Sequence, residues 1–472
     1  MRSSLEPGDW GLETGPEGEL LVDGCSTVSL AKAYGTPLHV VNESRLEETA
    51  LRFRQAAELL YPGLSSVHYA FKCNSVPAIV QSIKKAGLKA EVMSDFELDL
   101  ALRLGYRGED IVVNGPCKTD SFLRKCVTSR VRFIVVDSLD ELEALGSIAA
   151  AENMRADVLL RINPDYTPEK MNSGSATASR HGCAFGLDFK GGEVGSGLAR
   201  LKKMKNVGFF GFHFHIGTGI LNPRDYVRAL RCLKDLLSLA AGQGYEVKTV
   251  DVGGGYPSPT SRELTGREML VYQALHRLPY PWTRTGCPWF EDFILAIAGA
   301  VKGAFPTGQL PELLFEPGRS IVSANQLLLL TVHRIKNRPG VRKWLITDGG
   351  LGTVTLPTFY EYHEVFLAND VRRPRSEKVT ISGPVCFASD TVYRNILMPG
   401  VVPGEVLAVM DSGAYFTALE SSFGFPRPAI VSVNSGIHSL SRRRENLADM
   451  IGRDIIEKSS ETKEVVHEIR DY

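Results

Sequence analysis

A single lysine stands at the end of a short strand-like run, Tyr69-Ala70-Phe71-Lys72. The run is aromatic and apolar, and the polar pair Asn74-Ser75 follows it, which predicts a strand that ends in a turn at the lysine. A lysine in such a place is usually a solvated cation, although its amine can also form a Schiff base with a carbonyl compound. Whether Lys72 does chemistry therefore depends on the polar groups that the fold brings to it.

Three further motifs also stand where apolar runs end. They are Gly211-Phe212-His213-Phe214-His215, Asp251-Val252-Gly253-Gly254-Gly255 and Glu316-Pro317-Gly318-Arg319. Glu316 follows a buried-type run, where a carboxylate is costly unless it meets a cation such as a protonated pyridine. Bare glycine amides can approach a phosphate closely. An amine, a carboxylate and a phosphate cradle are the parts that pyridoxal phosphate requires, and the chain can supply each.

Each motif also has a simpler interpretation. Glu316 could form an ion pair with Arg319, and three glycines could form an ordinary turn. His213 and His215 share one face of a strand and could bind a metal, but no third ligand follows at a suitable spacing. We therefore expect no metal site.

The elements that must position these residues follow from eight strand-like runs. The runs cover residues 67–72, 90–94, 111–114, 132–136, 157–162, 208–215, 247–252 and 312–316, and segments of helical period separate them. This α/β alternation predicts a (β/α)8 barrel of the TIM type over residues 37–321. Catalytic groups of such barrels lie at the carboxyl ends of the strands, where Lys72, His215 and Glu316 stand.

Alternation along the strand before His215 predicts which side chains face inward. With a period of two residues, Phe210, Phe212 and Phe214 face the helices. His213 and His215 then point into the barrel.

After residue 322 the pattern changes to short β-like runs with frequent turns. No helical period recurs until Arg442–Ile455. We expect a second, mostly β domain of the sandwich or barrel type, formed by residues 1–36 and 322–472 and ending in a C-terminal helix.

Composition narrows the class of partner. The 472 residues are 43% hydrophobic, enough for two cores, and Lys+Arg and Asp+Glu both number 54. Without net charge, the chain has no field that would attract nucleic acid or a membrane surface, so we expect a small-molecule partner. Eight scattered cysteines without a C-x-x-C pair, and no apolar stretch of membrane-spanning length, predict reduced thiols in a cytoplasmic protein.

Together with two further motifs, the sequence resembles a known family. The additional motifs are Gly383-Pro384-Val385-Cys386 and Asp411-Ser412-Gly413-Ala414-Tyr415. From Tyr69 to Tyr415 the set is similar to the alanine-racemase-fold (fold type III) pyridoxal-phosphate decarboxylases, which include the diaminopimelate and ornithine decarboxylases. Alanine racemase itself shares the barrel and the lysine, but Glu316-Pro317-Gly318-Arg319 and the Cys386 motif favour decarboxylation.

The resemblance implies a role for each matching residue. Lys72 forms the Schiff base with the cofactor, and His215 stacks on the ring, whose nitrogen pairs with Glu316. The phosphate is held by Gly253, Gly254, Gly255, Gly318 and Tyr415. Arg319 contacts either the phosphate or a substrate carboxylate. Cys386 comes from the second subunit of a head-to-tail homodimer and returns a proton after carbon dioxide leaves.

The departures from the family lie where the substrate tail is recognised. Leu356 replaces the arginine that clamps the distal carboxylate of diaminopimelate, although Tyr360 is kept. Phe387 replaces the acidic residue that binds a distal ammonium. Losing two charge-assisted bonds disfavours a doubly charged tail. We therefore expect a non-standard or conjugated amino acid, as in siderophore or antibiotic biosynthesis.

Two other functions stay open. The chain could be a meso-diaminopimelate decarboxylase of lysine biosynthesis with a rearranged tail pocket. It could also be a catalytically silent homologue that regulates an active partner. Retention of Lys72, Glu316, Cys386 and Tyr415 argues against the silent homologue, because regulation alone would not need the cofactor residues.

Overall fold

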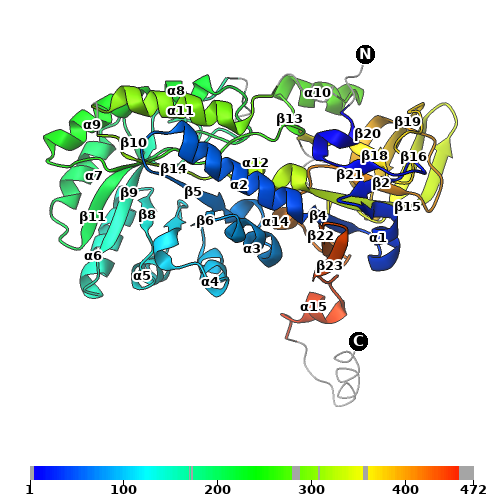
Figure 1. The fold of residues 1–472 in the computed structure, drawn as a ribbon, viewed down its shortest axis with the longest axis horizontal. Coiled ribbons are helices and arrows are strands. Elements are labelled where there is room, and N and C mark those ends of the chain that lie inside the picture. The colour runs from blue at the N-terminus through cyan, green and yellow to red at the C-terminus, as the bar shows by residue number, and fades with distance from the viewer. Residues whose placement is uncertain are drawn as a thin grey trace.

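The protein has two parts that lie side by side, a barrel and a mainly β part (Figure 1). The computed structural model describes residues 5–169, 171, 174–278, 287–306, 309–354 and 360–455. The long helix α2 (Glu43–Leu60) follows strand β4 (Leu38–Asn42) and packs along the barrel. Asn42 ends that strand and caps the helix, accepting a hydrogen bond from the backbone N–H of Arg45 at 3.1 Å.

Eight parallel strands close the barrel. They are β5 (Ser65–Ala70), β6 (Lys89–Val92), β7 (Ile111–Val113), β8 (Phe133–Val136), β9 (Ala156–Asn163), β11 (Val207–His213), β12 (Thr249–Asp251) and β14 (Glu312–Phe315). The order is β9-β11-β12-β14-β5-β6-β7-β8, and β8 pairs with β9 to close the ring. Each coincides with one of the predicted runs, so the predicted barrel is confirmed.

Helices connect the strands and form the outer layer. They are α3 (Pro77–Lys85), α4 (Asp95–Arg103), α5 (Asp120–Thr128), α6 (Leu139–Ala151), α7 (Glu193–Leu201), α8 (Arg224–Ala229), α9 (Leu233–Gly242), α11 (Phe290–Ala304) and the short α12 (Arg319–Val322). Ser94 and Ser138 each follow a strand and cap the next helix, accepting backbone hydrogen bonds from Glu97 and Glu141 at 3.2 Å. Strand ends and helix starts are thus only a few residues apart.

The prediction that Phe210 faces the helices is wrong. Phe210 packs inside the barrel, in ring contact with Phe133, whereas Phe212 and Phe214 lie in the outer core as predicted. The pairing of β11 with β9 shifts between Phe209 and Gly211, which breaks the alternation. A side chain at residue 211 would collide with the backbone of Thr249, so glycine permits the close approach of β12.

A mixed sheet forms the centre of the second part, in the order β20-β19-β16-β15-β4-β22-β23. The strands that follow β4 in the chain are β15 (Gln326–Arg338), β16 (Arg342–Thr347), β19 (Glu377–Ser382), β20 (Thr391–Met398), β22 (Ala429–Asn434) and β23 (Ile437–Arg442). β21 (Val406–Val409) pairs with both β15 and β18 (Val365–Leu367). The domain limits at residues 37 and 321 remain predictions. β4 lies inside the predicted barrel limits, but it pairs with β15 and β22 of the second part.

The N-terminal residues pack on this sheet. β1 (Glu13–Thr14), β2 (Leu20–Val22) and β3 (Cys25–Ser26) form a small sheet beside α1 (Thr27–Tyr34). Buried side chains of the N-terminal residues, including Trp10 and Leu20, share a hydrophobic core with Leu327 and Val406. None of the described helices is both long and apolar enough to span a membrane.

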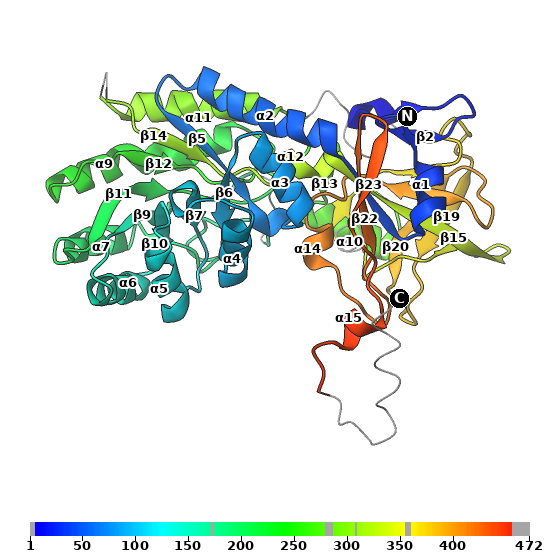
Figure 2. The same cartoon turned by 60° about the horizontal axis from the view of Figure 1, so that its bottom comes forward.

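The predicted helix Arg442–Ile455 is mostly absent. Arg442 ends β23, which forms a hairpin with β22, and only the short α15 (Leu447–Ile451) follows it (Figure 2). Of the predicted helix, Arg442 instead pairs with Ile430 of β22, and Asn446 caps the short helix that begins at Leu447.

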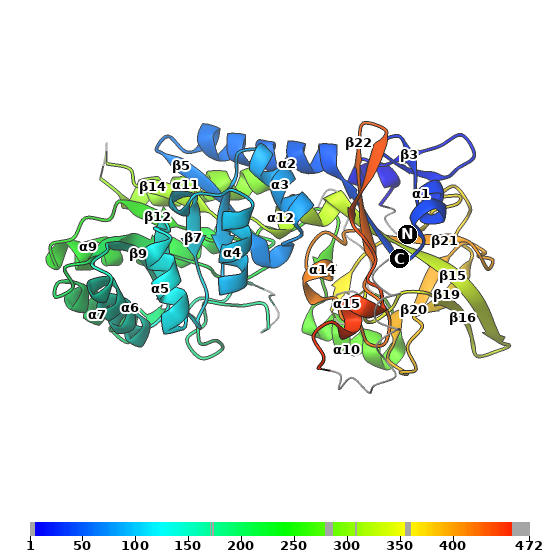
Figure 3. The ribbon, with the colours of Figure 1, turned by 90° about the horizontal axis from the view of Figure 1, so that it is seen from below.

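One segment leaves the barrel after β12. It contains β13 (Arg262–Glu263), which pairs with β17 (Glu361–Tyr362), and α10 (Gly266–Leu275). Figure 3 shows α10 against the mainly β part, and Tyr272 of α10 packs against the core of that part. The sequence analysis assigned no element to this segment.

Candidate active site

Lys72 lies in the turn directly after β5, and its partner is Glu91 of β6. Its Nζ donates to Glu91 Oε2 at 2.6 Å, and the Glu91 side chain is fully buried. Burial alone would lower the pKa of Lys72, but Glu91 and Glu316 outweigh it and hold the pKa above its usual value. The lysine is therefore an ammonium in the free protein.

Asn114 joins Glu91 to Glu316. Its Nδ2 donates to Glu91 Oε1 at 3.0 Å and to Glu316 Oε1 at 2.7 Å. The other oxygen of Glu316 lies 3.4 Å from His213 Nε2. Burial alone would raise the pKa of Glu316, but His213 and Lys72 hold it below its usual value. Glu316 is thus an ionised carboxylate at the end of β14.

Asp251 ends β12 and lies beside Glu316. Its Oδ1 accepts the Gly253 N–H at 2.8 Å, and its Oδ2 is buried without a partner among the described residues. Burial and the Glu316 charge raise the pKa of Asp251. Donor atoms of His213, Asp251 and Glu316 lie within 4.8 Å of one another. Two groups that could bind a metal together with His213 therefore lie beside it, although His215 is not one of them.

The glycine triplet orients His215. The Gly254 N–H donates to His215 Nδ1 at 3.2 Å, so this ring nitrogen is an acceptor. Burial, Lys72 and Arg161 lower the pKa of His215, so the ring is neutral. A Cβ at Gly254 would lie 2.2 Å from the backbone oxygen of Glu316. Glycine is thus required for β12 and β14 to end so close together.

Arg319 pairs with Glu361, and not with Glu316 as the simpler interpretation had it. The Arg319 Nη2–Glu361 Oε1 distance is 2.8 Å, and both residues are buried. His363 Nε2 lies 2.9 Å from the other oxygen of Glu361. Burial alone would raise the pKa of Glu361, but Arg319 and His363 hold it at about 2.

Tyr415 reaches the barrel from the second part of the chain. Its backbone N–H donates to the Cys73 carbonyl at 2.9 Å, next to Lys72, and its ring lies 5.2 Å from the Arg319 guanidinium. Gly318 packs against the same turn, because a Cβ there would lie 2.9 Å from Cys73 Cβ. The structure therefore brings Gly318, Arg319 and Tyr415 together around the Lys72 turn.

The remaining predicted residues lie apart from this cluster or outside the described part. Tyr360 is half-buried, and its carbonyl accepts the Leu264 N–H at 2.8 Å. Cys386 is exposed and Phe387 is 51% exposed in the single chain. Leu356 lies outside the described residues.

Two buried carboxylates of this cluster were not predicted from the sequence. Glu91 stands between Ala90 and Val92 in a buried strand, and this polar interruption was the available signal. Glu361 pairs with an arginine 42 positions earlier in the chain, a contact that no local pattern indicates.

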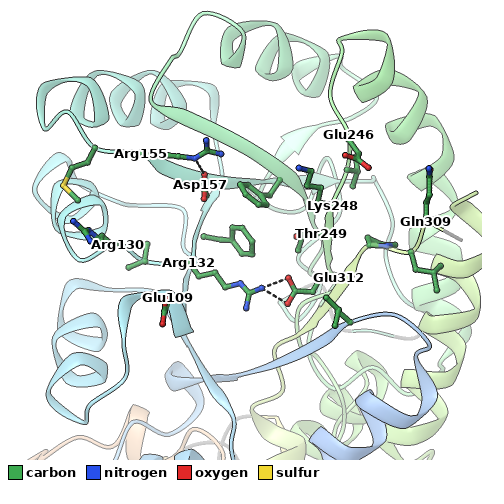
Figure 4. A pocket seen from close by; sticks show the side chains of 18 of the residues that line it. Glu109, Arg130, Arg132, Arg155, Asp157, Glu246, Lys248, Thr249, Gln309 and Glu312 are labelled. Carbon is green, nitrogen blue, oxygen red and sulfur yellow. Dashed lines mark hydrogen bonds and ion pairs between the residues drawn. The ribbon is translucent and has the colours of Figure 1, made fainter.

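A wide cavity lies at the opposite, amino-terminal end of the barrel (Figure 4). It measures about 920 Å³ and is lined by residues that precede or begin the strands. Its charges are largely paired: Arg132 lies 2.6 Å from Glu312, and Arg155 lies 2.6 Å from Asp157. No predicted site residue lines it. The active face is therefore the other end of the barrel.

The residues at that face fit pyridoxal phosphate. Lys72 supplies an amine, Glu316 a buried carboxylate and His215 a neutral ring. The glycines at the ends of β12 and β14 stand where any side chain would collide with backbone or packed atoms. A metal ion could meet the three donors at Glu316, but it would give Lys72 no role. The complete set favours the organic cofactor.

Comparison with known proteins agrees. Residues 45–323 match the model of the pyridoxal-dependent decarboxylase, pyridoxal-binding domain. The diaminopimelate decarboxylase of Methanocaldococcus jannaschii is 30% identical over 447 residues, covering 93% of this chain and 96% of the relative. That of Bacillus subtilis is 30% identical over 443 residues, covering 93% and 95%. The crystal structure of the M. jannaschii enzyme superimposes with a TM-score of 0.83 at 29% identity, covering 95% and 98%.

Fold, site and relatives lead to the same assignment. The barrel and mainly β domain match a solved decarboxylase over nearly their whole length. The half-buried amine of Lys72 and the buried carboxylate of Glu316 lie at the carboxyl ends of the strands. The chain therefore belongs to the pyridoxal-dependent decarboxylases and is a carboxy-lyase that uses pyridoxal phosphate.

Proposed function

We propose that the protein decarboxylates an α-amino acid with a non-standard or conjugated tail, as in siderophore or antibiotic biosynthesis. The observation that carries this proposal is the replacement of both tail-binding residues, by Leu356 and by Phe387. Arg319 offers little compensation, because Glu361 already pairs with it at 2.8 Å. A cytoplasmic location fits the eight free thiols.

When bound, pyridoxal phosphate supplies an aldehyde that captures amines and a ring that accepts the electron pair left by carbon dioxide. Lys72 would hold the cofactor through its amine, and Glu91 would receive or return the proton that Lys72 Nζ must lose. The 2.6 Å contact between these two groups supports that role. The Glu91 side chain is fully buried, so its end of this contact is shielded from water.

Glu316 and His215 orient the ring. The ionised Glu316 carboxylate favours a protonated pyridine nitrogen, and Asn114 fixes its position through the 2.7 Å hydrogen bond. His215 would contact the ring, and the Gly254 N–H holds the histidine in its orientation. In this proposal, Gly255, Gly318 and Tyr415 would contact the phosphate. The amides of Gly253 and Gly254 already donate to Asp251 and His215, so their part is to shape the turn.

Cys386 acts in the other subunit of a head-to-tail homodimer. Its exposure in the single chain, beside the 51% exposed Phe387, fits a segment that a partner covers. The Cys386 thiol would then give a proton to the substrate carbon after carbon dioxide leaves. Phe387 would contribute an apolar wall to the same substrate tail.

The names of the relatives favour a second candidate, meso-diaminopimelate decarboxylation. Two relatives named diaminopimelate decarboxylase are 30% identical over 93% of this chain. In that case residues other than Leu356 and Phe387 must bind the distal carboxylate and ammonium. Retention of Tyr360 is compatible with both candidates.

Carbon dioxide release from the cofactor-loaded protein separates the candidates. The panel contains meso-diaminopimelate, lysine, ornithine, arginine and citryl-conjugated diaminopropionate. We expect faster release from a non-standard or conjugated amino acid than from meso-diaminopimelate, lysine, ornithine or arginine. The double variant Leu356→Arg plus Phe387→Glu should improve turnover of diaminopimelate. Rapid release from diaminopimelate alone would contradict the proposal. Cofactor absorbance without release from any amino acid would favour a silent homologue.

A further inference from the structure

A second cavity opens at the active face, beside Arg319. It measures about 590 Å³. Loops after β9, β11 and β12 line it together with Arg319, which follows β14. Because carboxyl-terminal loops of neighbouring strands surround the reaction centre of a barrel enzyme, this cavity can receive the part of a substrate that extends from that centre.

Glu263 brings a carboxylate to this cavity. It ends β13, whose pairing places Glu263 opposite Glu361, the partner of Arg319. It belongs to the segment that leaves the barrel after β12, and Asp411 anchors the start of that segment through hydrogen bonds from Ser258 at 2.9 Å and Thr260 at 2.7 Å. Glu263 is therefore held by backbone pairing and buried anchors on one side of the cavity.

The two oxygens of Glu263 differ. Oε2 accepts a hydrogen bond from Ser175 Oγ at 2.6 Å. Oε1 is buried and has no hydrogen-bond partner among the described residues. It lies near Gly219, where an added Cβ would be 3.5 Å away, and Gly219 also lines the cavity. A buried carboxylate oxygen without a donor is costly, so a ligand that donates a hydrogen bond there would be stabilised.

Of the three arginines that line the cavity, Arg262, Arg267 and Arg319, the first and the last have carboxylate partners. Arg319 pairs with Glu361, and Arg262 forms two hydrogen bonds with Glu268, at 2.9 and 2.6 Å. Burial and the Glu361 charge raise the pKa of Glu263, a direction that a ligand cation would reverse. The site thus holds a polar group whose missing partner would be a donor, and preferably a positively charged one.

We propose that Glu263 determines substrate specificity by binding a protonated amine at the distal end of the substrate. The inference rests on the proposed amino-acid decarboxylation and narrows its substrate to tails that carry such a group. It also explains how the chain can bind a cationic tail although Phe387 replaces the acidic residue of the family. The carboxylate that binds the tail is then Glu263, from the segment that follows β12 in the same chain.

Binding of a matched pair of amines tests the proposal in the wild-type holoenzyme. Pentane-1,5-diamine and pentan-1-amine share one amine and the chain length, and only the first carries a distal ammonium. By calorimetry the diamine should bind at least about tenfold more tightly, as expected for one charge-assisted hydrogen bond. Equal affinities would overturn the proposal without any variant, so failure of a variant to fold cannot leave it untested.

The variants Glu263→Gln and Glu263→Asp identify the residue. The first should abolish the preference for the diamine, and the second should keep part of it. Glu246→Gln removes an exposed carboxylate at the opposite end of the barrel and should retain the full preference. A preference that persists in Glu263→Gln would overturn the assignment to this residue.

Carbon dioxide release, measured in parallel, distinguishes the two proposals. A Glu263-dependent diamine preference without release from any amino acid would refute the decarboxylation proposal and leave the cation site intact. Release together with a preference that does not depend on Glu263 would refute the cation site alone.

Discussion

The carboxylate of Glu91 determines at which pH Lys72 can lose its proton. Because this carboxylate raises the pKa of Lys72, the neutral amine that attacks the cofactor becomes available only at higher pH. Glu91→Gln should therefore move the pH midpoint of cofactor capture downward, by about one to three units. Pyridoxal phosphate is added to cofactor-free protein, and the rate at which Schiff-base absorbance appears is measured across a pH series.

Glu91→Asp is the matched control, since it keeps the charge and should shift the midpoint less. A midpoint that is the same in wild type and Glu91→Gln would mean that Glu91 does not set the protonation of Lys72.

Single residues were predictable from sequence where they interrupt an apolar pattern. Lys72 and Glu316 were found because each ends a strand and belongs to a motif. Glu91 interrupts its strand in the same way but stands in no motif, so it was missed. The partner of Arg319 could not be predicted. Glu361 belongs to β17, and only the folded chain brings β17 beside Arg319.

Among the elements, the turn after β12 depends most directly on the absence of a side chain at Gly254. A Cβ at residue 254 would lie 2.2 Å from the Glu316 carbonyl oxygen, a distance that real structures avoid. Gly254→Ala should therefore push β12 and β14 apart, lower the free energy of unfolding by about 1–3 kcal/mol and weaken cofactor binding. Urea unfolding and a cofactor titration measure the two effects.

Gly242→Ala is the control for this change. Gly242 ends helix α9, and a Cβ there has no neighbour within 4 Å. This variant should keep the wild-type stability or gain up to about 1 kcal/mol, because alanine loses less chain entropy in a helix. Equal stability of the two alanine variants would show that the β12–β14 contact tolerates a side chain.

Elements were predictable where their pattern was strong and local. All eight barrel strands follow from separate apolar runs, and Ser94 and Ser138 mark helix starts. The bulge near Phe210 could not be predicted, because it results from the approach of β12 to Gly211 rather than from hydrophobic pattern. The start of the predicted helix at Arg442 was wrong for a similar reason, since Arg442 pairs with Ile430 of β22.

At the scale of the whole molecule, each part of the fold buries a neutral histidine. Burial lowers the pKa of His39, in β4, and of His68, in β5, to about 3 each. The unfolded chain protonates these residues below about pH 6.5, so it binds more protons and stability falls as the pH drops from 6.5 towards 3. Each histidine contributes up to about 1.4 kcal/mol per pH unit.

His39→Gln and His68→Gln should each reduce the slope of unfolding free energy against pH, by about one proton, between pH 6.5 and 4.5. Comparison with wild type isolates this effect, because carboxyl groups such as Glu97, whose pKa burial raises to about 7, contribute to both proteins alike. Denaturant unfolding at several pH values measures the slope. An unchanged slope in both variants would mean that the histidines are charged in the folded protein.

The proposed dimer makes its own prediction for the assembled molecule. If Lys72 of one subunit and Cys386 of its partner form one site, Lys72→Ala and Cys386→Ala proteins should each be inactive alone. Mixed under conditions that exchange subunits, half of the dimers combine both variants, and each of these has one site with both residues intact. Activity should then recover to about a quarter of the wild-type value, as the symmetry of a two-fold dimer requires.

Cys386→Ser, which retains a weaker proton donor, should keep more activity than Cys386→Ala when assayed alone. Mixing without recovery, while gel filtration shows exchanged dimers, would place Cys386 and Lys72 in the same subunit's site. A Cys386→Ala protein that is fully active alone would remove Cys386 from the reaction.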